Sequence, residues 1–336
     1  MKVLLYTEME KKVRKSGLGK AIEHQKTALT NEGIEYTTNP DDDYDIMHIN
    51  TWFLKSYRMA KKAKKRGKKI VYHAHSTEED YRNGFIFSKS TSKFVKWWLI
   101  KCYSLGDVIV TPTPYSKRLL EGYKGLERKK IYAISNGIDM NLFKKDKKAG
   151  EEFRKKYGYT KDDKVIIGIG LYIRRKGIVD FVELAKRLPE YKFIWFGFSS
   201  LKAATRDVRR AVNTKLPNLT FAGYVEQEVI KSAMSGANLY LFPTLEETEG
   251  IPIIEACACK QNAIIRDIPI FEGWLEDGKN VYKAKDVDEF EKKIKDFFDG
   301  KLPSLVDKAY EVAVERDIKT VGKQLKEVYE YVLKNK

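Results

Sequence analysis

Short runs rich in β-branched residues alternate with amphipathic segments along almost the whole chain of 336 residues. In the first half, strands are predicted at 2–7, 44–50, 68–75, 107–111 and 129–135, with a helix over Leu18–Leu29. In the second half, strands are predicted at 164–170, 192–197, 219–223, 237–243 and 262–267. This alternation predicts an α/β fold in which parallel sheets carry helices on both faces.

The length and one charged segment predict two doubly wound domains. A chain of 336 residues is long for a single core and suits two domains of about 150 residues each. The alternation breaks at residues 141–163, where charged residues predominate and a connection plus a helix is expected. We therefore predict a first domain at 1–150 and a second at 151–317. The tail after Asp286 has helical periodicity, and residues 318–336 are expected to pack back on the first domain.

Two glutamates follow the predicted strand at 237–243, where an open α/β sheet binds its ligands. Glu247 lies in the loop, and Glu255, eight positions later, lies in a helix that begins near Gly250 and Pro252. Free amides at a helix start bind phosphate, whereas carboxylates accept hydrogen bonds from hydroxyl groups. The combination fits a nucleotide sugar in a cleft between two domains. The alternative is that both acids only favour the helix N-terminus.

The glutamate pair resembles the E-x7-E motif of the retaining family 4 glycosyltransferases. Other segments resemble that family in the same order, and they extend over nearly the whole chain: "SGLG" at 16–19, "ISNGIDMNLF" at 134–143, "IGLYIRRKG" at 169–177 and "NLTFAGYV" at 218–225. The resemblance implies the GT-B fold, with two facing Rossmann-like domains and an interdomain cleft.

The resemblance also assigns roles in donor binding. It gives Glu247 the transferred sugar, Glu255 the ribose of the nucleotide, and Lys176 the diphosphate leaving group. Gly250 and Ile251 would present the helix start to the donor. In the first domain, Gly17 lies in the loop expected to approach the donor diphosphate or the acceptor; it could also serve a simple turn.

One departure from the family pattern concerns the phosphate loop. The family usually has an arginine directly after the loop glycine, but here Leu171 follows Gly170. Arg174 or Arg175 could supply the missing charge, and either could equally be a solvated surface residue.

A histidine at the end of the strand at 68–75 completes the predicted active site. By resemblance, His75 corresponds to the family's histidine near the transferred sugar, and His73 is the competing candidate. The following stretch, 79–81, resembles one found in the family's glycolipid-forming members. A histidine at a strand end can also be purely structural.

The first half is strongly basic. Residues 1–150 contain 31 Lys and Arg against 17 Asp and Glu, a net charge of +14 out of +17 for the chain. Residues 85–103 contain no acid and many aromatic side chains, and residues 61–69 form a second basic stretch. An interfacial helix has this composition, whereas the alternative is a core helix. The predicted membrane-facing residues are Lys93, Phe94, Lys96, Trp97, Trp98 and Lys101.

Three segments and the short length narrow the likeness within the family: "HAHSTEEDYRN" at 73–83, "EETEGI" at 246–251 and "RDIPIFEGWL" at 266–275. Together they resemble bacterial synthases that add a second hexose to monoglucosyldiacylglycerol with an α-1,2 linkage. The resemblance therefore implies a UDP-glucose donor, with UDP-galactose as the alternative, a glycolipid acceptor, no cofactor and no metal. We also predict a cytoplasmic protein attached peripherally to the inner face of the cell membrane, where it contacts anionic lipid.

Three rival functions remain at this point. A soluble sugar or cell-wall glycan could replace the lipid acceptor. Nucleic-acid binding would suit the charge, but the sequence has no recognised binding motif. A dinucleotide-dependent oxidoreductase is disfavoured because neither first strand is followed by G-x-G-x-x-G.

Overall fold

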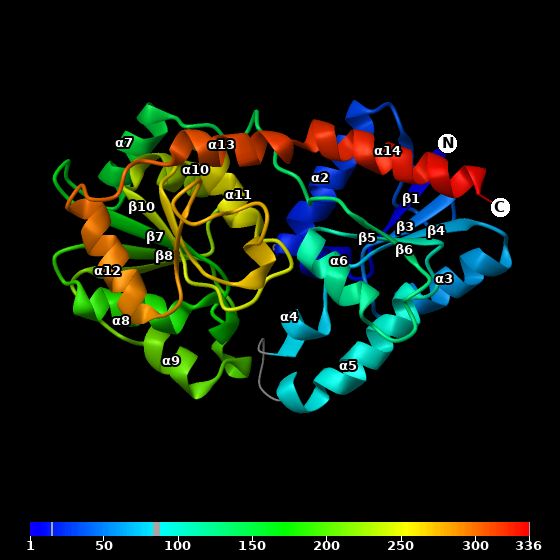
Figure 1. Ribbon diagram of the computed structural model, residues 1–336, viewed down its shortest axis with the longest axis horizontal. Helices are drawn as coiled ribbons and strands as arrows, with labels where there is room; N and C mark the ends of the chain where they lie inside the picture. The colour runs from blue at the N-terminus through cyan, green and yellow to red at the C-terminus, as the bar shows by residue number, and fades with distance from the viewer. Residues whose placement is uncertain (15, 83–87, 336) are drawn as a thin grey trace. The chain divides into compact units, whose positions relative to one another are not determined.

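The computed structural model describes residues 1–14, 16–82 and 88–335. The chain forms two compact units (Figure 1). Unit 1 comprises Met1–Tyr81, Ser90–Asp139 and Arg316–Lys336, and unit 2 comprises Arg82–Lys89 and Met140–Glu315. None of the described helices is long and apolar enough to cross a membrane.

Unit 1 contains a six-stranded, fully parallel sheet in the order β2-β1-β3-β4-β5-β6. β3, β4 and β5 are almost completely buried, as expected for strands covered on both faces. The short strand β2 was not predicted. The strands are β1 (Lys2–Tyr6), β2 (Glu35–Thr37), β3 (Ile46–Ile49), β4 (Lys69–His73), β5 (Val108–Thr111) and β6 (Lys130–Ala133).

Helices cover both faces of this sheet. Apolar residues of α3, α5 and α6 pack on one face, and those of α2 and α14 pack on the other. A Cβ atom on Gly322 of α14 would lie 2.7 Å from the carbonyl oxygen of Ala28 in α2, so these two helices pack in close contact. The helices are α1 (Glu10–Val13), α2 (Gly17–Asn31), α3 (Leu54–Lys65), α4 (Glu78–Arg82), α5 (Ser88–Tyr103), α6 (Pro114–Glu121) and α14 (Ile318–Lys334).

Unit 2 contains a second six-stranded parallel sheet, in the order β12-β11-β10-β7-β8-β9. The predicted strands of the second half are all present, and the three-residue strand β12 is an addition. The strands are β7 (Val165–Ile169), β8 (Lys192–Phe196), β9 (Leu219–Gly223), β10 (Leu239–Phe242), β11 (Ala263–Arg266) and β12 (Tyr282–Ala284).

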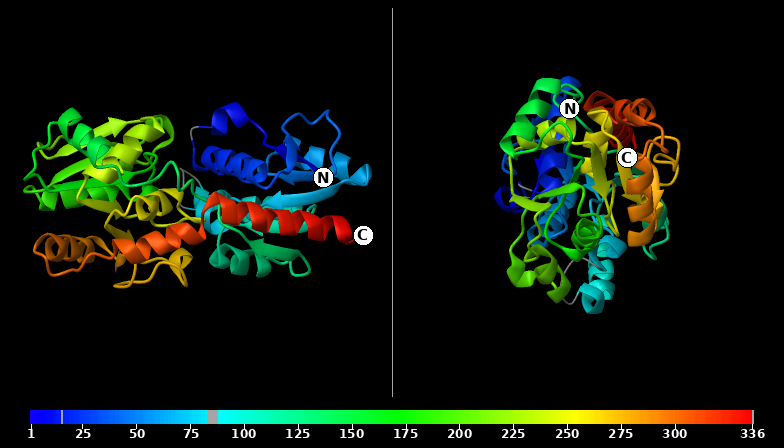
Figure 2. Two further views of the ribbon diagram at one scale, coloured as in Figure 1. Left: turned by 90° about the horizontal axis from the view of Figure 1, so that it is seen from above. Right: turned by 90° about the vertical axis from the view of Figure 1, so that its left-hand side faces the viewer.

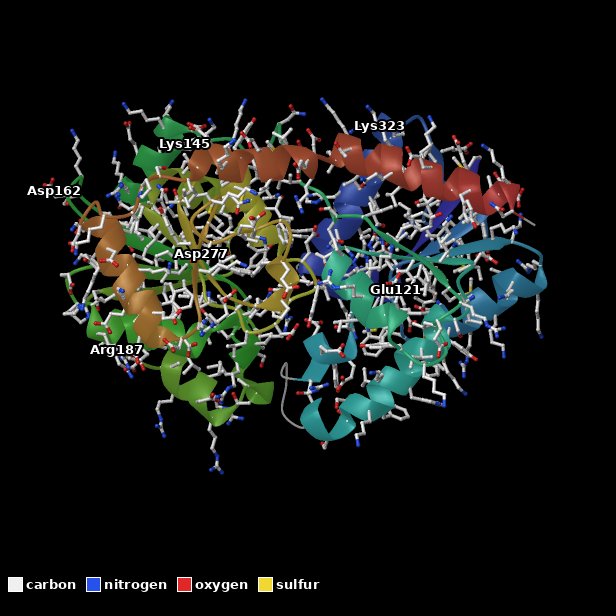
Figure 3. The ribbon with its side chains drawn as sticks, in the orientation of Figure 1. Glu121, Lys145, Asp162, Arg187, Asp277 and Lys323 are labelled. Atoms are coloured by element: carbon white, nitrogen blue, oxygen red, sulfur yellow. The ribbon has the colours of Figure 1, made fainter. Side chains whose placement is uncertain are left out.

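The unit 2 helices also form two layers (Figures 1 and 2). α7 packs on α10 and α11 on α13, while α8 packs on α9 and α12. Arg187, labelled in Figure 3, joins α8 to α12 through ion pairs with Asp288 at 2.6 Å and Glu291 at 3.3 Å. The helices are α7 (Lys147–Lys156), α8 (Ile178–Arg187), α9 (Arg206–Val212), α10 (Gln227–Gly236), α11 (Ile251–Ala258), α12 (Val287–Phe298) and α13 (Val306–Glu315).

Candidate active site

Three loops meet at the carboxyl end of the unit 2 sheet, after β7, β8 and β10. The loop after β7 contacts the loop after β8 through backbone: Gly197 has φ +118°, and a Cβ there would lie 2.2 Å from the carbonyl oxygen of Gly170. That same oxygen accepts a 2.9 Å hydrogen bond from the indole of Trp195. Two glycines and a buried tryptophan thus fix the start of the predicted phosphate loop.

The loop after β7 also joins the loop after β10. Gly177 has φ +74°, and a Cβ there would lie 2.1 Å from the carbonyl oxygen of Pro243, so only glycine fits. The carbonyl oxygen of Arg175 accepts hydrogen bonds from the amide of Leu245 at 2.7 Å and the hydroxyl of Thr244 at 3.1 Å. The basic residues and the loop that carries Glu247 therefore form one hydrogen-bonded assembly.

Glu247 lies at the centre of this assembly. Its side chain is buried and contacts the ammonium group of Lys176 and a guanidinium nitrogen of Arg175, the latter at 3.3 Å. Burial disfavours the charged carboxylate, but the two adjacent positive charges and their hydrogen bonds outweigh it and lower the pKa of Glu247. Glu247 is therefore ionised at neutral pH and pairs directly with the lysine that we predicted for the diphosphate.

The two candidate arginines point in different directions. Arg175 is mostly buried and donates a 2.7 Å hydrogen bond to the carbonyl oxygen of Glu246. Arg174 is largely exposed and forms a 2.6 Å ion pair with Asp207 of α9. The structure thus brings Arg175, and not Arg174, to Glu247 and Lys176.

Helix α11 begins directly after this loop. Gly250 is its N-cap with φ +94°, Ile251 is its first residue, and Glu255 in its second turn is fully buried. Tyr240 of β10 lies near both glutamates: burial raises the pKa of its hydroxyl, and the charges of Glu255 and Glu247 raise it further. The two acids thus surround one buried tyrosine, with Glu247 in the loop and Glu255 within the helix.

In unit 1, His75 follows β4 and is partly exposed, whereas His73 is 2% exposed. The His75 Nε2 atom lies 2.9 Å from the Oδ1 atom of Asn50, and its ring stacks on His73 with centroids 3.9 Å apart. Burial lowers the pKa of His75, and the nearby His48 lowers it further. His75 is therefore the neutral imidazole that reaches the surface of unit 1, and His73 is a core residue.

The glycine loop after β1 gives a different result from the one expected. Gly17 is the first residue of α2, and a Cβ there would meet nothing within 4 Å. Gly19 is the constrained position, because its Cβ would lie 2.4 Å from the carbonyl oxygen of Arg14. Packing therefore requires glycine at 19, and any functional role of Gly17 stays a prediction.

The predicted membrane-facing residues separate into two groups on α5. Phe94 and Trp97 are 66% and 47% exposed, with ring centroids 5.5 Å apart, and Lys93 is exposed beside them. The ammonium group of Lys101 lies 4.4 Å from the centre of the Trp97 ring. These four residues form an exposed aromatic and basic face. Residues 85–87 of the acid-free segment lie outside the described residues.

Trp98 and Lys96 do not belong to that face. The Trp98 indole donates a 2.7 Å hydrogen bond to the carbonyl oxygen of Trp52, and its ring packs 5.1 Å from Tyr57. The ammonium group of Lys96 lies over the Tyr123 ring, 4.1 Å from its centre. Trp98 is only partly buried, but it packs against the core of unit 1, so it is less available than Trp97 and its membrane role stays a prediction.

Several polar residues at the site were missed by sequence reasoning. Asn50 follows β3 and contacts His75, and the register of β3 and β4 places their carboxyl ends together. The sequence could have indicated Asn50, because a polar residue directly after one strand is expected to lie near a polar residue after the neighbouring strand. Nothing in the local sequence indicated Thr244, or the pair of Arg266 and Asp180 that supports the Pro243 carbonyl.

The two Rossmann-like units, with a glutamate pair and a basic loop at the carboxyl edge of the second sheet, have the architecture of the GT-B class of glycosyltransferases. Sequence profiles agree: residues 150–315 match the glycosyl transferases group 1, and residues 34–142 match glycosyltransferase family 4. The chain belongs to the family 4 glycosyltransferases.

Individual relatives support this assignment. The processive diacylglycerol alpha-glucosyltransferase of Acholeplasma laidlawii is 39% identical over all of both chains. The alpha-galactosylglucosyldiacylglycerol synthase of Streptococcus pneumoniae is 25% identical over 71% of this chain and 65% of its own.

Among solved structures, a sucrose-phosphate synthase from Thermosynechococcus elongatus superposes with a TM-score of 0.82 at 15% identity, covering all of both chains. The Anabaena protein HepE in complex with UDP-glucose gives 0.78 at 18% identity, covering 98% of this chain and 100% of its own. These likenesses confirm the predicted GT-B fold.

Proposed function

We propose that this glycosyltransferase moves a glucosyl residue from UDP-glucose to a glucosylated diacylglycerol, with retention of configuration, and so makes an α-1,2-linked diglycosyldiacylglycerol. The observation that carries the proposal is the 39% identity, over the whole chain, to a processive diacylglycerol alpha-glucosyltransferase. Two more distant relatives are named for galactosylglucosyl- and monoglucosyldiacylglycerol synthesis. UDP-galactose is the competing donor.

The unit 2 assembly supplies the groups that such a reaction needs. As the glycosidic bond breaks, negative charge develops on the departing diphosphate, and Lys176 and Arg175 are the buried cations that would stabilise it. Glu247 contacts both cations and is ionised, so its carboxylate would accept hydrogen bonds from the sugar hydroxyls. We assign the acceptor's attack to the face that the diphosphate leaves, with the leaving phosphate taking the acceptor's proton.

The start of α11 would bind the rest of the donor. Gly250 and Ile251 begin the helix, whose free amides and dipole favour phosphate. We assign Glu255 to the ribose, because a buried carboxylate one turn into the helix suits a diol better than a phosphate. In unit 1, we assign His75 to the transferred sugar and Gly17 to backbone approach of donor or acceptor.

The exposed face of α5 would bring the enzyme to its lipid acceptor. Phe94 and Trp97 offer apolar area beside Lys93 and Lys101, and α3 adds an exposed Leu54 and many lysines. The two helices are adjacent, since Tyr57 of α3 packs on Trp98 of α5. Aromatic side chains within a basic surface bind anionic membranes peripherally, so we place the enzyme on the inner face of the cell membrane.

The transfer reaction is tested with radiolabelled UDP-glucose and UDP-galactose, each offered diacylglycerol, monoglucosyldiacylglycerol or a soluble glucoside in mixed micelles. Product chromatography should show label from UDP-glucose in a diglycosyl lipid, and digestion with α- and β-glucosidases should show an α-linkage. If label appears only in the soluble glucoside, the acceptor is not a lipid. If label is transferred only from UDP-galactose, the donor is UDP-galactose and not UDP-glucose.

Membrane attachment is tested with a matched tryptophan pair. Trp97→Ala should bind anionic vesicles several-fold more weakly while unfolding at the same denaturant concentration, because its ring is 47% exposed. Trp98→Ala should instead unfold more easily, since its partly buried indole donates a hydrogen bond to Trp52 and its ring packs on Tyr57. Unchanged vesicle sedimentation of Trp97→Ala would remove this face from the proposal.

A further inference from the structure

A chain of hydrogen bonds runs through the interior of unit 1 from the C-terminal helix to His75. The hydroxyl of Tyr329 in α14 lies 2.6 Å from His48 Nδ1, and His48 Nε2 lies 3.1 Å from His73 Nδ1. The chain continues from His73 Nδ1 to Gln25 Nε2 at 2.9 Å, from Gln25 Nε2 to Asn50 Oδ1 at 2.9 Å, and from Asn50 Oδ1 to His75 Nε2 at 2.9 Å. We call the first five residues, Tyr329, His48, His73, Gln25 and Asn50, the buried relay.

Every member of the buried relay is shielded from water. Tyr329 and His48 are fully buried, and the other three are at most 2% exposed. Burial lowers the pKa of His48 to about 3 and lowers that of His73 as well, so both rings are neutral at pH 7. A neutral imidazole has one nitrogen that donates and one that accepts. Each hydrogen bond therefore constrains the next one.

The tyrosine hydroxyl sets the direction of the chain. Among the described residues, the hydrogen-bond partner of the Tyr329 hydroxyl is His48 Nδ1. The hydroxyl can donate or accept, and donating to this nitrogen gives its buried proton an acceptor. His48 must then carry its proton on Nε2 and donate to His73 Nδ1, which also accepts from the amide nitrogen of Gln25. A second hydrogen on that nitrogen goes to Asn50 Oδ1.

The hydrogen bond at the Asn50 end of the buried relay determines which nitrogen of His75 carries the proton. Because Asn50 contributes an acceptor oxygen, His75 must donate from Nε2, which places its proton there and leaves Nδ1 as the basic nitrogen. Turning over both amides would reverse the donors along the chain of hydrogen bonds. The Tyr329 hydroxyl would then accept from His48 Nδ1, and its own buried proton would have no acceptor among the described residues. The proton position on His75 is thus coupled to a hydroxyl group 254 residues away in the sequence.

We propose that the buried relay is a positioning network that holds His75 in its Nε2-protonated tautomer. The stacked His73 ring also fixes the plane of the His75 ring. The relay residues act through His75 and do not touch the sugar themselves. The proposal rests on the proposed function only for its kinetic consequence, since the tautomer itself can be observed without substrate.

The first test is nitrogen NMR of the imidazole rings, whose chemical shifts distinguish the two neutral tautomers. The chain has four histidines, so the spectrum is simple. Tyr329→Phe keeps the ring and removes the hydroxyl, and it should convert His75 from one tautomer to a mixture. Gln25→Met, which removes the central amide, should do the same. Unchanged His75 signals in both variants would overturn the proposal.

A matched control separates this effect from the loss of any buried hydroxyl. Tyr282 in unit 2 is also buried, and its hydroxyl donates a 2.7 Å hydrogen bond to the carbonyl oxygen of Pro303. Tyr282→Phe should cost comparable stability and leave the His75 signals unchanged. A His75 change of equal size in Tyr282→Phe would show that the signals report general loosening and would also overturn the proposal.

The second test is kinetic. Tyr329→Phe should lower kcat about fivefold while the donor KM changes less than twofold, because only the ring that faces the sugar is affected. In a His75→Ala background, Tyr329→Phe should have no further effect. An equal fold-loss in both backgrounds would refute action through His75. If the wild type transfers no glucose to lipid, the proposed function fails, and the NMR result alone decides the relay.

Discussion

The two units hold their polar site residues in opposite ways. In unit 2, Glu247, Lys176 and Arg175 are charged, and they hold one another in loops. In unit 1, His75 is neutral, and the side chains that contact it, Asn50 and His73, are uncharged and buried. A charged cluster suits a group that must meet developing charge, whereas a neutral network suits a group that needs a defined tautomer. This difference predicts how substitutions and acid pH affect activity and stability in each unit.

The largest effect is expected from removing the charge of Glu247. Glu247→Gln should reduce the rate of sugar transfer by about a thousandfold, roughly 4 kcal/mol in the barrier, because in the role that we propose it removes a buried negative charge beside the reacting sugar. Single-turnover rates at saturating donor measure this loss. Asp207→Asn is the control, since it removes a carboxylate from the exposed pair with Arg174 and should leave the rate unchanged. A wild-type transfer rate in Glu247→Gln would show that the charge of Glu247 is not needed for the reaction. The proposed difference between a charged site in unit 2 and a neutral one in unit 1 would then have no functional meaning.

Lys176 and Arg174 form the next comparison. Lys176→Ala should slow transfer by a factor on the order of 100, about 3 kcal/mol, through loss of one cation at the leaving group. Arg174→Ala should change the rate less than twofold, because its side chain is largely exposed and paired with Asp207. Equal losses in the two variants would mean that the buried location of Lys176 carries no special role.

Acid should destabilise unit 1 before unit 2. All four histidines lie in unit 1, and the folded-state pKa of His48 is lowered to about 3. The unfolded chain therefore binds more protons below about pH 6.5, so stability is present above that pH and is lost as the pH falls. At pH 5, the loss from His48 should be about 2 kcal/mol.

Hydrogen exchange between pH 7 and pH 5 measures this order. Amides of β3 and β4 should lose protection while those of β7 and β10 keep it. In unit 2, the lowered pKa of Glu247 contributes stability that is lost only as the pH falls below about 4.5. Simultaneous loss in both sheets would show that the histidines do not control acid stability.

The smallest effect is expected at Glu255. Glu255→Gln should weaken donor binding about tenfold, roughly 1.4 kcal/mol, with a smaller change in kcat, because the ribose is bound alike before and during reaction. Calorimetric titration with UDP measures the affinity directly. A loss confined to kcat would move Glu255 from the ribose to the reacting sugar.

The fold was largely predictable because long alternating patterns specify a parallel α/β sheet. The two missed strands, β2 and β12, have only three residues each and lie at the sheet edges, where burial is incomplete or the pattern is too short to detect. The tail predicted as helical throughout is broken into α12, α13 and α14 by short connections.

The site was predictable only where a motif or a strand end marked it. Glu247 and Lys176 could be placed near one another, but the choice between Arg174 and Arg175 depends on a single turn of 3₁₀-helix over Arg174–Lys176. Trp97 and Trp98 likewise differ by one helical step, which leaves Trp97 exposed and packs the partly buried Trp98 against the core. The contact of His48 with Tyr329 joins residues 281 positions apart, and no local pattern encodes it.

The position of α14 has a consequence for how the protein is made. Unit 1 begins at Met1 yet includes Arg316–Lys336, whereas all of unit 2 precedes that segment. During synthesis on the ribosome, α2 can cover part of one apolar face of the first sheet, but the part covered by Ile318, Leu325 and Val328 stays open until unit 2 has emerged. Unit 1 therefore begins to be synthesised before unit 2 but can complete its fold only after unit 2 has been synthesised. In a nascent chain stalled before α14, the apolar surface that this helix covers would be exposed to chaperones and proteases, although all residues of unit 2 have been synthesised.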